Sequence, residues 1–200
     1  LALAQMLWVP TVEPIAAFLL ALGLVLTQKA LYRSSYDQLT MLPGRDMFLL
    51  QVQRALQYHP GTAVTVVFLD IDRFKLINQS FGHLTGDRVL KTIGQRLRQF
   101  LPTSAQLARV GGDEFAFLLP VHDQPKVDQW LSRLQTELSA PFSVARRRLS
   151  VTSSMGVAMA HRDHPPTAHD LLRDAHTAMY RAKALHEYRH EVFASTMHEE

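Results

Sequence analysis

The sequence contains no cysteine among its 200 residues. Disulfides, thiolate zinc sites and a cysteine nucleophile are therefore excluded, and the composition fits a reducing compartment without proving one. Any metal ion must be held by oxygen or imidazole ligands.

The chain also lacks a strong net charge. It has 21 Lys and Arg against 18 Asp and Glu, for a formal net charge of only +3, and the basic residues are scattered. This distribution argues against a nucleic-acid-binding surface but is compatible with a small anionic substrate. With 47% hydrophobic residues, the composition is that of an ordinary globular domain with a real core.

Charge is scarce near the N-terminus, where Glu13 is the single charged residue among the first 28. The uncharged run over residues 14–27 is shorter than a membrane span of about 20 residues and has the length of a buried or interfacial helix. Interruptions aside, both interpretations stay open. Lys29 and Arg33 follow it, which would place the rest of the chain on the cytoplasmic side of a membrane. We expect a helix through residues 28–34, which lack Gly and Pro.

From Tyr36 onward, helical and strand-like patterns alternate. The order is helix, strand, two helices, a hairpin, helix, strand and helix, which predicts an α+β fold with helices packed on a mostly antiparallel sheet. The expected helices cover residues 46–58, 74–81, 87–100, 127–138 and 169–185, and the expected strands cover residues 63–69, 106–110, 115–119, 149–159 and 191–194.

Two adjacent glycines followed by two carboxylates, Gly111 to Glu114, separate two of the expected strands. Glycine permits the positive φ that a tight hairpin requires. Most turns of this kind are ordinary and exposed, so the hairpin does not identify a site by itself.

A second acidic motif follows the apolar strand that ends at Leu69. Asp70 comes directly after it, and Asp72 points the same way two residues later. If the hairpin lies beside this strand, Asp70, Asp113 and Glu114 converge and provide the hard oxygen ligands that Mg²⁺ prefers. The alternative, stronger for Asp72 than for Asp70, is capping of the helix that starts near Phe74.

Taken together, these motifs resemble a GGDEF-type diguanylate cyclase domain over roughly residues 35–195. The resemblance implies a palm-like, antiparallel-rich sheet flanked by helices, as in nucleotide cyclases, which joins two GTP into cyclic di-GMP and releases pyrophosphate. The matching motifs are Asp37-Gln38-Leu39-Thr40, Leu42-Pro43-Gly44-Arg45, Asp70-Ile71-Asp72-Arg73-Phe74-Lys75, Asn78, Phe81-Gly82-His83, Gly86-Asp87, Gly111 to Phe115, Ser154 to Val157 and Ala178 to Lys183.

The resemblance also implies roles for individual residues. Asp70, the Ile71 carbonyl and Asp113 would hold Mg²⁺ or Mn²⁺, and Asp113 and Glu114 would be catalytic, with the proton acceptor left open between them. The implied substrate-binding residues are Asn78 and Asp87 at the guanine, His83 beside them, Lys75 and Lys183 at the phosphates, and Phe74, Gly111 and Gly112. The alternatives are that Asn78 and Asp87 cap helices and that the lysines are solvated.

Two positions depart from the family pattern. Glu187 stands where an arginine commonly helps bind phosphate, and Pro102 and Ala105 stand where the product-inhibition site has Arg and Asp. We therefore expect weaker phosphate binding and no feedback through that site. Because one domain offers one nucleotide site, catalysis would require a homodimer. The alternative is a catalytically weak GTP-binding module that regulates an attached domain, such as an EAL phosphodiesterase.

Three further expectations concern the ends of the chain. Residues 1–34 form an apolar segment, membrane-proximal or signalling, and residues 196–200 begin a C-terminal linker that resembles the joint to an EAL domain. His186 to His190 spells H-E-x-x-H, the helical zinc motif of metalloproteases, which is a competing hypothesis.

Overall fold

The computed structural model describes residues 14–23, 35–58, 64–119, 121, 123–144, 147–160, 166–185, 190–194 and 197. Residues 14–23 form a helix whose large apolar side chains are exposed. Among the residues described, no helix has both the length and the apolar character that a membrane span requires. The helix expected over residues 28–34 lies outside the described residues.

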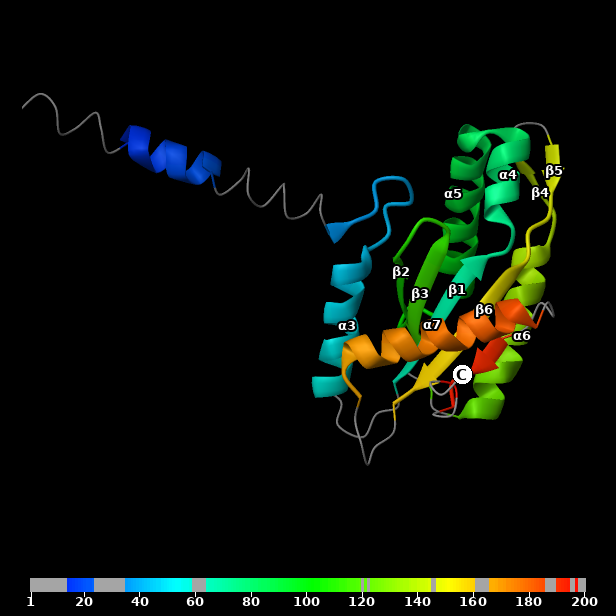
Figure 1. The fold of residues 1–200 in the computed structure, drawn as a ribbon. Helices are drawn as coiled ribbons and strands as arrows, with labels where there is room; N and C mark the ends of the chain where they lie inside the picture. The colour runs from blue at the N-terminus through cyan, green and yellow to red at the C-terminus, as the bar shows by residue number, and fades with distance from the viewer. Residues whose placement is uncertain are drawn as a thin grey trace, which may run out of the picture.

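Five strands form one mixed sheet in the order β2-β3-β1-β6-β7 (Figure 1). The central strand β1 (Thr65–Ile71) is antiparallel to both β3 (Glu114–Leu119) and β6 (Ser153–Met159). At one edge β2 (Gln106–Arg109) is antiparallel to β3, and at the other β7 (His190–Val192) is parallel to β6. The predicted α+β class and the mostly antiparallel sheet are confirmed.

Helices cover both faces of this sheet. α3 (Arg45–Tyr58) and α7 (Ala168–Ala184) lie on one face, and α7 crosses it in Figure 1. α4 (Phe74–Phe81), α5 (His83–Phe100) and α6 (Gln124–Ser139) lie on the other.

Because both faces are covered, every residue of β1 is buried. Val66 and Phe68 join the core under α3 and α7, whereas Val67, Leu69 and Ile71 join the core under α5 and α6. This two-sided burial explains why the strand is a continuous apolar run without alternation.

Two boundaries differ from the sequence prediction. The strand expected over residues 149–159 ends at Met159 as predicted, but it begins only at Ser153, because β4 (Phe142–Val144) and β5 (Arg147–Leu149) form a separate hairpin. No Gly or Pro marks this break, and the β4 strand is only three residues long.

The helix expected from residue 87 begins at His83. Gly82 alone separates α4 from α5, at φ +80°, so one glycine ends one helix and starts the next. The Thr85 hydroxyl donates to the Phe81 carbonyl at 2.8 Å across this junction.

α7 packs directly on the backbone of β6 at Gly156. A Cβ atom there would lie 2.1 Å from the Ala175 carbonyl oxygen and 2.1 Å from the Met179 nitrogen. We expect Gly156→Ala to lower the free energy of unfolding by about 2–3 kcal/mol, since the helix must move away from the sheet. Urea unfolding measures this.

The control is Gly94→Ala in α5, where the new Cβ would lie 3.4 Å from the nearest atom, on the Leu42 side chain. Alanine there should keep or raise stability, by up to about 1 kcal/mol, through its helix propensity. Equal stability of Gly156→Ala and the wild type would contradict the packing argument.

Candidate functional site

The candidate site lies where β1 meets the hairpin between β2 and β3. Asp70 and Glu114 are directly opposite each other in the β1–β3 register, and the Ile71 N–H donates to the Asp113 carbonyl at 3.2 Å. The fold therefore places the hairpin beside β1 and brings together two pairs of neighbouring residues that are more than 40 positions apart in the chain.

Arg109 holds the hairpin in place. Its Nη1 lies 2.9 Å from both carboxylate oxygens of Asp37, and its Nε donates to the Gly112 carbonyl at 3.1 Å. Asp37 also accepts hydrogen bonds from the Thr40 N–H (2.7 Å) and hydroxyl (2.6 Å). Burial would raise the pKa of Asp37, but these hydrogen bonds and the guanidinium outweigh it and lower that pKa.

This anchoring was not predicted from the sequence, where Asp37 and Thr40 carried no role of their own. The available signals were an arginine two residues before a Gly-Gly pair and an Asp-x-x-Thr turn. Neither signal shows that the two segments meet, because they are about 70 residues apart.

Lys183, in the last turn of α7, reaches Asp70 with its Nζ 2.7 Å from Oδ1. The Asp70 side chain is only 9% exposed, and this burial raises the pKa of Asp70 to about 6 even though Lys183 opposes the shift. Burial alone would lower the pKa of Lys183, but Asp70 raises it, so the ammonium is retained. The site therefore favours a positive charge beside Asp70.

Asp72 faces the same region. It accepts a 2.7 Å hydrogen bond from the Ser154 hydroxyl on one oxygen, while its Oδ2 is buried without a hydrogen-bond partner in the described part of the chain. The alternative in which Asp72 caps α4 is wrong, because Arg73 at φ 55° is the N-cap and no side chain bonds there.

These donors suit a hard cation, since all of them are carboxylate or carbonyl oxygens and one buried oxygen is unpaired. Within the described ranges, however, no three His, Asp or Glu side chains are arranged to hold a metal ion. The backbones of Asp70, Asp113 and Glu114 therefore lie close together as expected, but their side chains do not form a metal site in this structure.

The Glu114 side chain explains much of this difference. A Cβ on Gly111 would lie 2.0 Å from Glu114 Oε2, so the carboxylate folds back over the first hairpin glycine. Glu114 Oε1 lies 3.8 Å from Nε2 of His176 in α7, whose ring makes T-shaped contacts with the rings of Phe68 and Tyr180. His176 was not predicted, because helical spacing does not distinguish it from a solvated histidine.

The second group of expected residues lies on α4 and α5. A Cβ on Gly86 would lie 1.9 Å from Asn78 Oδ1 and 3.1 Å from Phe74 Cζ, so the Asn78 amide rests against the backbone one residue before Asp87. Asn78 and Asp87 are half-buried, and His83 and Lys75 are exposed.

The capping alternatives for Asn78 and Asp87 are wrong. Arg73 and Gly82 occupy the N-cap positions of the two helices, and Asn78 and Asp87 lie inside α4 and α5.

Other predicted positions fall elsewhere. His190 belongs to β7, so the helical H-E-x-x-H interpretation is wrong. Glu187 lies outside the described residues. Pro102 and Ala105 form a turn before β2, in which the Ala105 N–H donates to the Pro102 carbonyl at 2.9 Å.

These features define a palm-like α+β domain with acidic residues at the end of its central strand and on the adjoining hairpin. The chain belongs to the GGDEF family, because the family profile "Diguanylate cyclase, GGDEF domain" matches residues 34–189.

Characterised relatives agree with this assignment. The chain is 39% identical over 159 residues to the diguanylate cyclase DgcP of Pseudomonas aeruginosa and 34% identical over 147 residues to the cyclic di-GMP phosphodiesterase PdeR of Escherichia coli. These alignments cover 78% and 74% of this chain but only 23% and 22% of the relatives. The chain therefore corresponds to about a quarter or less of either protein.

Solved structures show the same fold. The GGDEF domain of TpbB from Pseudomonas aeruginosa superposes with a TM-score of 0.77 at 34% identity, covering 82% of this chain and 97% of that one. The GGDEF domain of DgcB from Caulobacter crescentus, solved in complex with c-di-GMP, gives 0.72 at 27% identity and covers 79% and 95%.

The raised pKa of Asp70 predicts a pH-dependent stability in metal-free buffer. The folded form binds this proton more tightly than the unfolded chain, whose pKa is near 3.8, so the stabilisation is complete below pH 4 and disappears as the pH rises through 6. Asp70→Asn does not titrate. The free energy of unfolding of Asp70→Asn minus that of the wild type should therefore increase by about 1 kcal/mol between pH 5 and pH 7.5.

The measurement is urea unfolding of both proteins at the two pH values, with EDTA present. Asp46→Asn, at an exposed position in the first turn of α3, is the matched control and should show no such change. A constant or reversed difference for Asp70→Asn would show that the carboxylate is not destabilised by burial.

Proposed function

We propose that this domain is a diguanylate cyclase that condenses two GTP into cyclic di-GMP and pyrophosphate. The observation that carries the proposal is the buried Asp70 at the end of β1, paired in register with Glu114 of the Gly-Gly-Asp-Glu hairpin and held by Lys183. The match to the family and to relatives named diguanylate cyclases supports it.

In this proposal Asp70, the Ile71 carbonyl and Asp113 would hold Mg²⁺ or Mn²⁺. The bound ion would neutralise charge on the phosphate oxygens and lower the pKa of the attacking 3′-hydroxyl. Asp113 and Glu114 would lie at the reacting hydroxyl, and one of the two would accept its proton. Glu114 would have to turn away from Gly111 to do so.

The phosphates would contact two lysines and the two glycines of the hairpin. Lys183, which is paired with Asp70 in this structure, would pair with a phosphate oxygen when Asp70 holds a cation, and Lys75 would provide a second charge. Gly111 and Gly112 would let the phosphates approach the backbone closely.

The base would bind between α4 and α5. Guanine offers one acceptor flanked by N–H donors, which an amide and a carboxylate match, so Asn78 and Asp87 would read it. Phe74 and His83 would border this pocket. The contact between Asn78 and Gly86 supports this placement, because it fixes the amide beside Asp87.

Dimerisation is part of this mechanism. Each domain would present one GTP, and both 3′-hydroxyls must attack, so two copies would face each other as a homodimer. The division of the chain at residues 34 and 195, a C-terminal EAL domain and an inner-membrane attachment through residues 1–28 stay predictions from the sequence. The comparisons give no support to the membrane attachment.

A second candidate is a weakly active GTP-binding module that regulates an attached domain. Two observations favour it: Glu187 replaces the arginine expected at the phosphates, and PdeR, a similar protein, is named a phosphodiesterase.

Incubation of the chain with GTP and Mg²⁺ or Mn²⁺, followed by nucleotide separation, tests the proposal. Wild type should form cyclic di-GMP, and Asp70→Ala and Asp113→Ala should each lose at least about 100-fold of the rate, because each removes a metal ligand. Asp46→Ala, an exposed acid on α3, should keep full activity. Saturable GTP binding without turnover at high protein concentration would instead support the regulatory module.

Product feedback provides a separate test. Since Pro102 and Ala105 replace the Arg and Asp of the inhibitory site, millimolar cyclic di-GMP should not inhibit noncompetitively. The double variant Pro102→Arg/Ala105→Asp should acquire such inhibition, seen in initial rates at saturating GTP. Saturable product binding outside the GTP site in wild type, lost on mutation near Pro102, would contradict the expectation.

A further inference from the structure

α7 carries two side chains that face the acids at the ends of β1 and β3. Lys183 Nζ lies 2.7 Å from Asp70 Oδ1, and His176 Nε2 lies 3.8 Å from Glu114 Oε1. Positions seven residues apart share one face of a helix, and α7 crosses the sheet over these strands (Figure 1). Each of the two acids that are opposite in the β1–β3 register therefore has its own partner on α7.

The imidazole of His176 is held by two aromatic rings. Its ring centroid lies 4.8 Å from that of Phe68 in β1 and 5.5 Å from that of Tyr180 in α7, both in T-shaped geometry. Phe68 is 1% exposed and belongs to the core between the sheet and α7. Because such ring pairs are stabilising, His176 is a fixed group against which a flexible side chain can rest.

The Glu114 side chain is the movable part. A Cβ on Gly111 would lie 2.0 Å from Oε2 and 2.9 Å from Cδ of Glu114, so the carboxylate fills the space beside the glycine. The hairpin backbone is fixed at both ends. The Val110 N–H donates to the Glu114 carbonyl at 3.0 Å, and Arg109 Nε donates to the Gly112 carbonyl at 3.1 Å. Rotation of the side chain alone is therefore enough to move the carboxylate.

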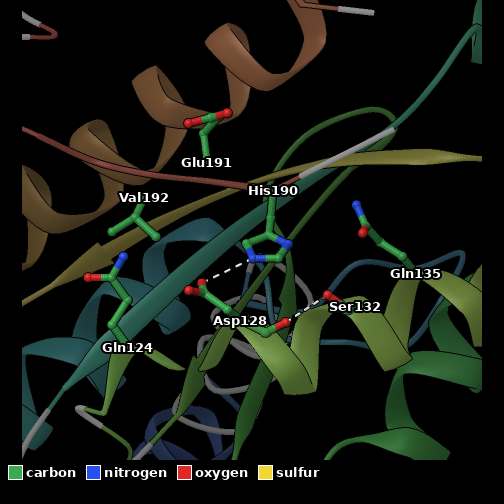
Figure 2. A pocket seen from close by; sticks show the side chains of 7 residues that line it. All are labelled: Gln124, Asp128, Ser132, Gln135, His190, Glu191 and Val192. Atoms are coloured by element: carbon green, nitrogen blue, oxygen red, sulfur yellow. Dashed lines mark hydrogen bonds and ion pairs between the residues drawn. The ribbon is translucent and has the colours of Figure 1, made fainter. Parts of the chain in front are cut away.

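The contact between His176 and Glu114 is weak enough to be released. Their side chains are 41% and 28% exposed, and 3.8 Å is longer than a hydrogen bond. A histidine–carboxylate pair elsewhere in the fold differs: His190 Nε2 lies 3.0 Å from Asp128 Oδ1, and the pair joins β7 to α6 (Figure 2). That pair is within hydrogen-bond distance and links two elements, whereas His176 holds only a side chain.

Glu114 lies where the proposed function needs open backbone. In that proposal the phosphates approach Gly111 and Gly112, and Glu114 lies at the reacting hydroxyl. With its carboxylate beside Gly111, Glu114 blocks the first requirement and does not meet the second. Its negative charge also repels a phosphate. A group that stabilises this conformer therefore opposes GTP binding.

We propose that His176 is a positioning residue that holds Glu114 over Gly111 in the nucleotide-free domain and thereby weakens GTP binding. This proposal rests on the proposed function. GTP displaces the carboxylate from Gly111, the contact with His176 is lost, and Glu114 turns to the 3′-hydroxyl. Because the contact exists only before GTP binds, His176 raises KM and does not change kcat.

Calorimetric titration of the complete chain with 3′-deoxy-GTP and Mg²⁺ tests the proposal. This analogue lacks the attacking hydroxyl, so it binds without reacting. His176→Ala should lower its Kd about 2- to 5-fold, the range expected for a contact between partly exposed groups, and should lower the KM for GTP similarly at unchanged kcat. His176→Gln, whose amide can face Glu114 in the same way, should restore the wild-type Kd. His169→Ala, at an exposed position of α7, is the matched control and should also keep it.

A second measurement needs no nucleotide. In ¹H–¹⁵N spectra of the free chain, the Gly111 amide should shift in His176→Ala and in Glu114→Ala, because in both variants the carboxylate no longer lies over the glycine. His176→Gln also lacks the imidazole but should keep the wild-type Gly111 position, which separates movement of the carboxylate from loss of the ring.

Two results would overturn this inference alone: an unchanged Gly111 amide in His176→Ala, or a Kd for 3′-deoxy-GTP that is not lower in that variant than in wild type. If neither wild type nor any variant binds 3′-deoxy-GTP or forms cyclic di-GMP, the proposed function fails and the inference fails with it.

Discussion

The burial of the Asp70 carboxylate near the end of a fully buried strand is the constraint on which the rest of the site depends. An ionised carboxylate in such a position is unfavourable unless a positive charge lies beside it. In this structure Lys183 provides that charge from α7, at 2.7 Å. α7 must therefore lie tightly across β1 and β6, and the absence of a side chain at Gly156 makes this approach possible.

A second ion pair sets the hairpin that faces Asp70. Arg109 connects the Gly112 carbonyl to Asp37, and the turn that contains Asp37 is closed by the hydrogen bond from the Gly44 N–H to the Ser35 carbonyl at 2.7 Å. The first described residues of the domain are thus joined to the hairpin through one side chain. A displacement of the segment before Asp37 would act directly on the backbone that carries Asp113 and Glu114.

The sequence predicted those features that depend on local pattern. The bounds of α4 were predicted as observed, and β1 was predicted within two residues, because amphipathic spacing and continuous apolar burial are visible along the chain. The β4–β5 hairpin was missed, since strands of three residues carry little signal. Two contacts join segments that are distant in the chain: Arg109 with Asp37, and His176 with Glu114. The local sequence does not indicate which charged groups will meet.

The charges around Asp70 connect the free domain with the proposed reaction. Burial is the largest cause of the raised pKa of Asp70, Asp113 and Asp72 raise it further, and Lys183 opposes the shift. One lysine does not neutralise three carboxylates, so the site keeps a negative potential that attracts a divalent cation. In the proposed reaction Asp70 would be neutralised by that cation, and Lys183, whose side chain is 42% exposed, would keep its charge for a phosphate. The same lysine would then stabilise the fold without nucleotide and bind phosphate with it.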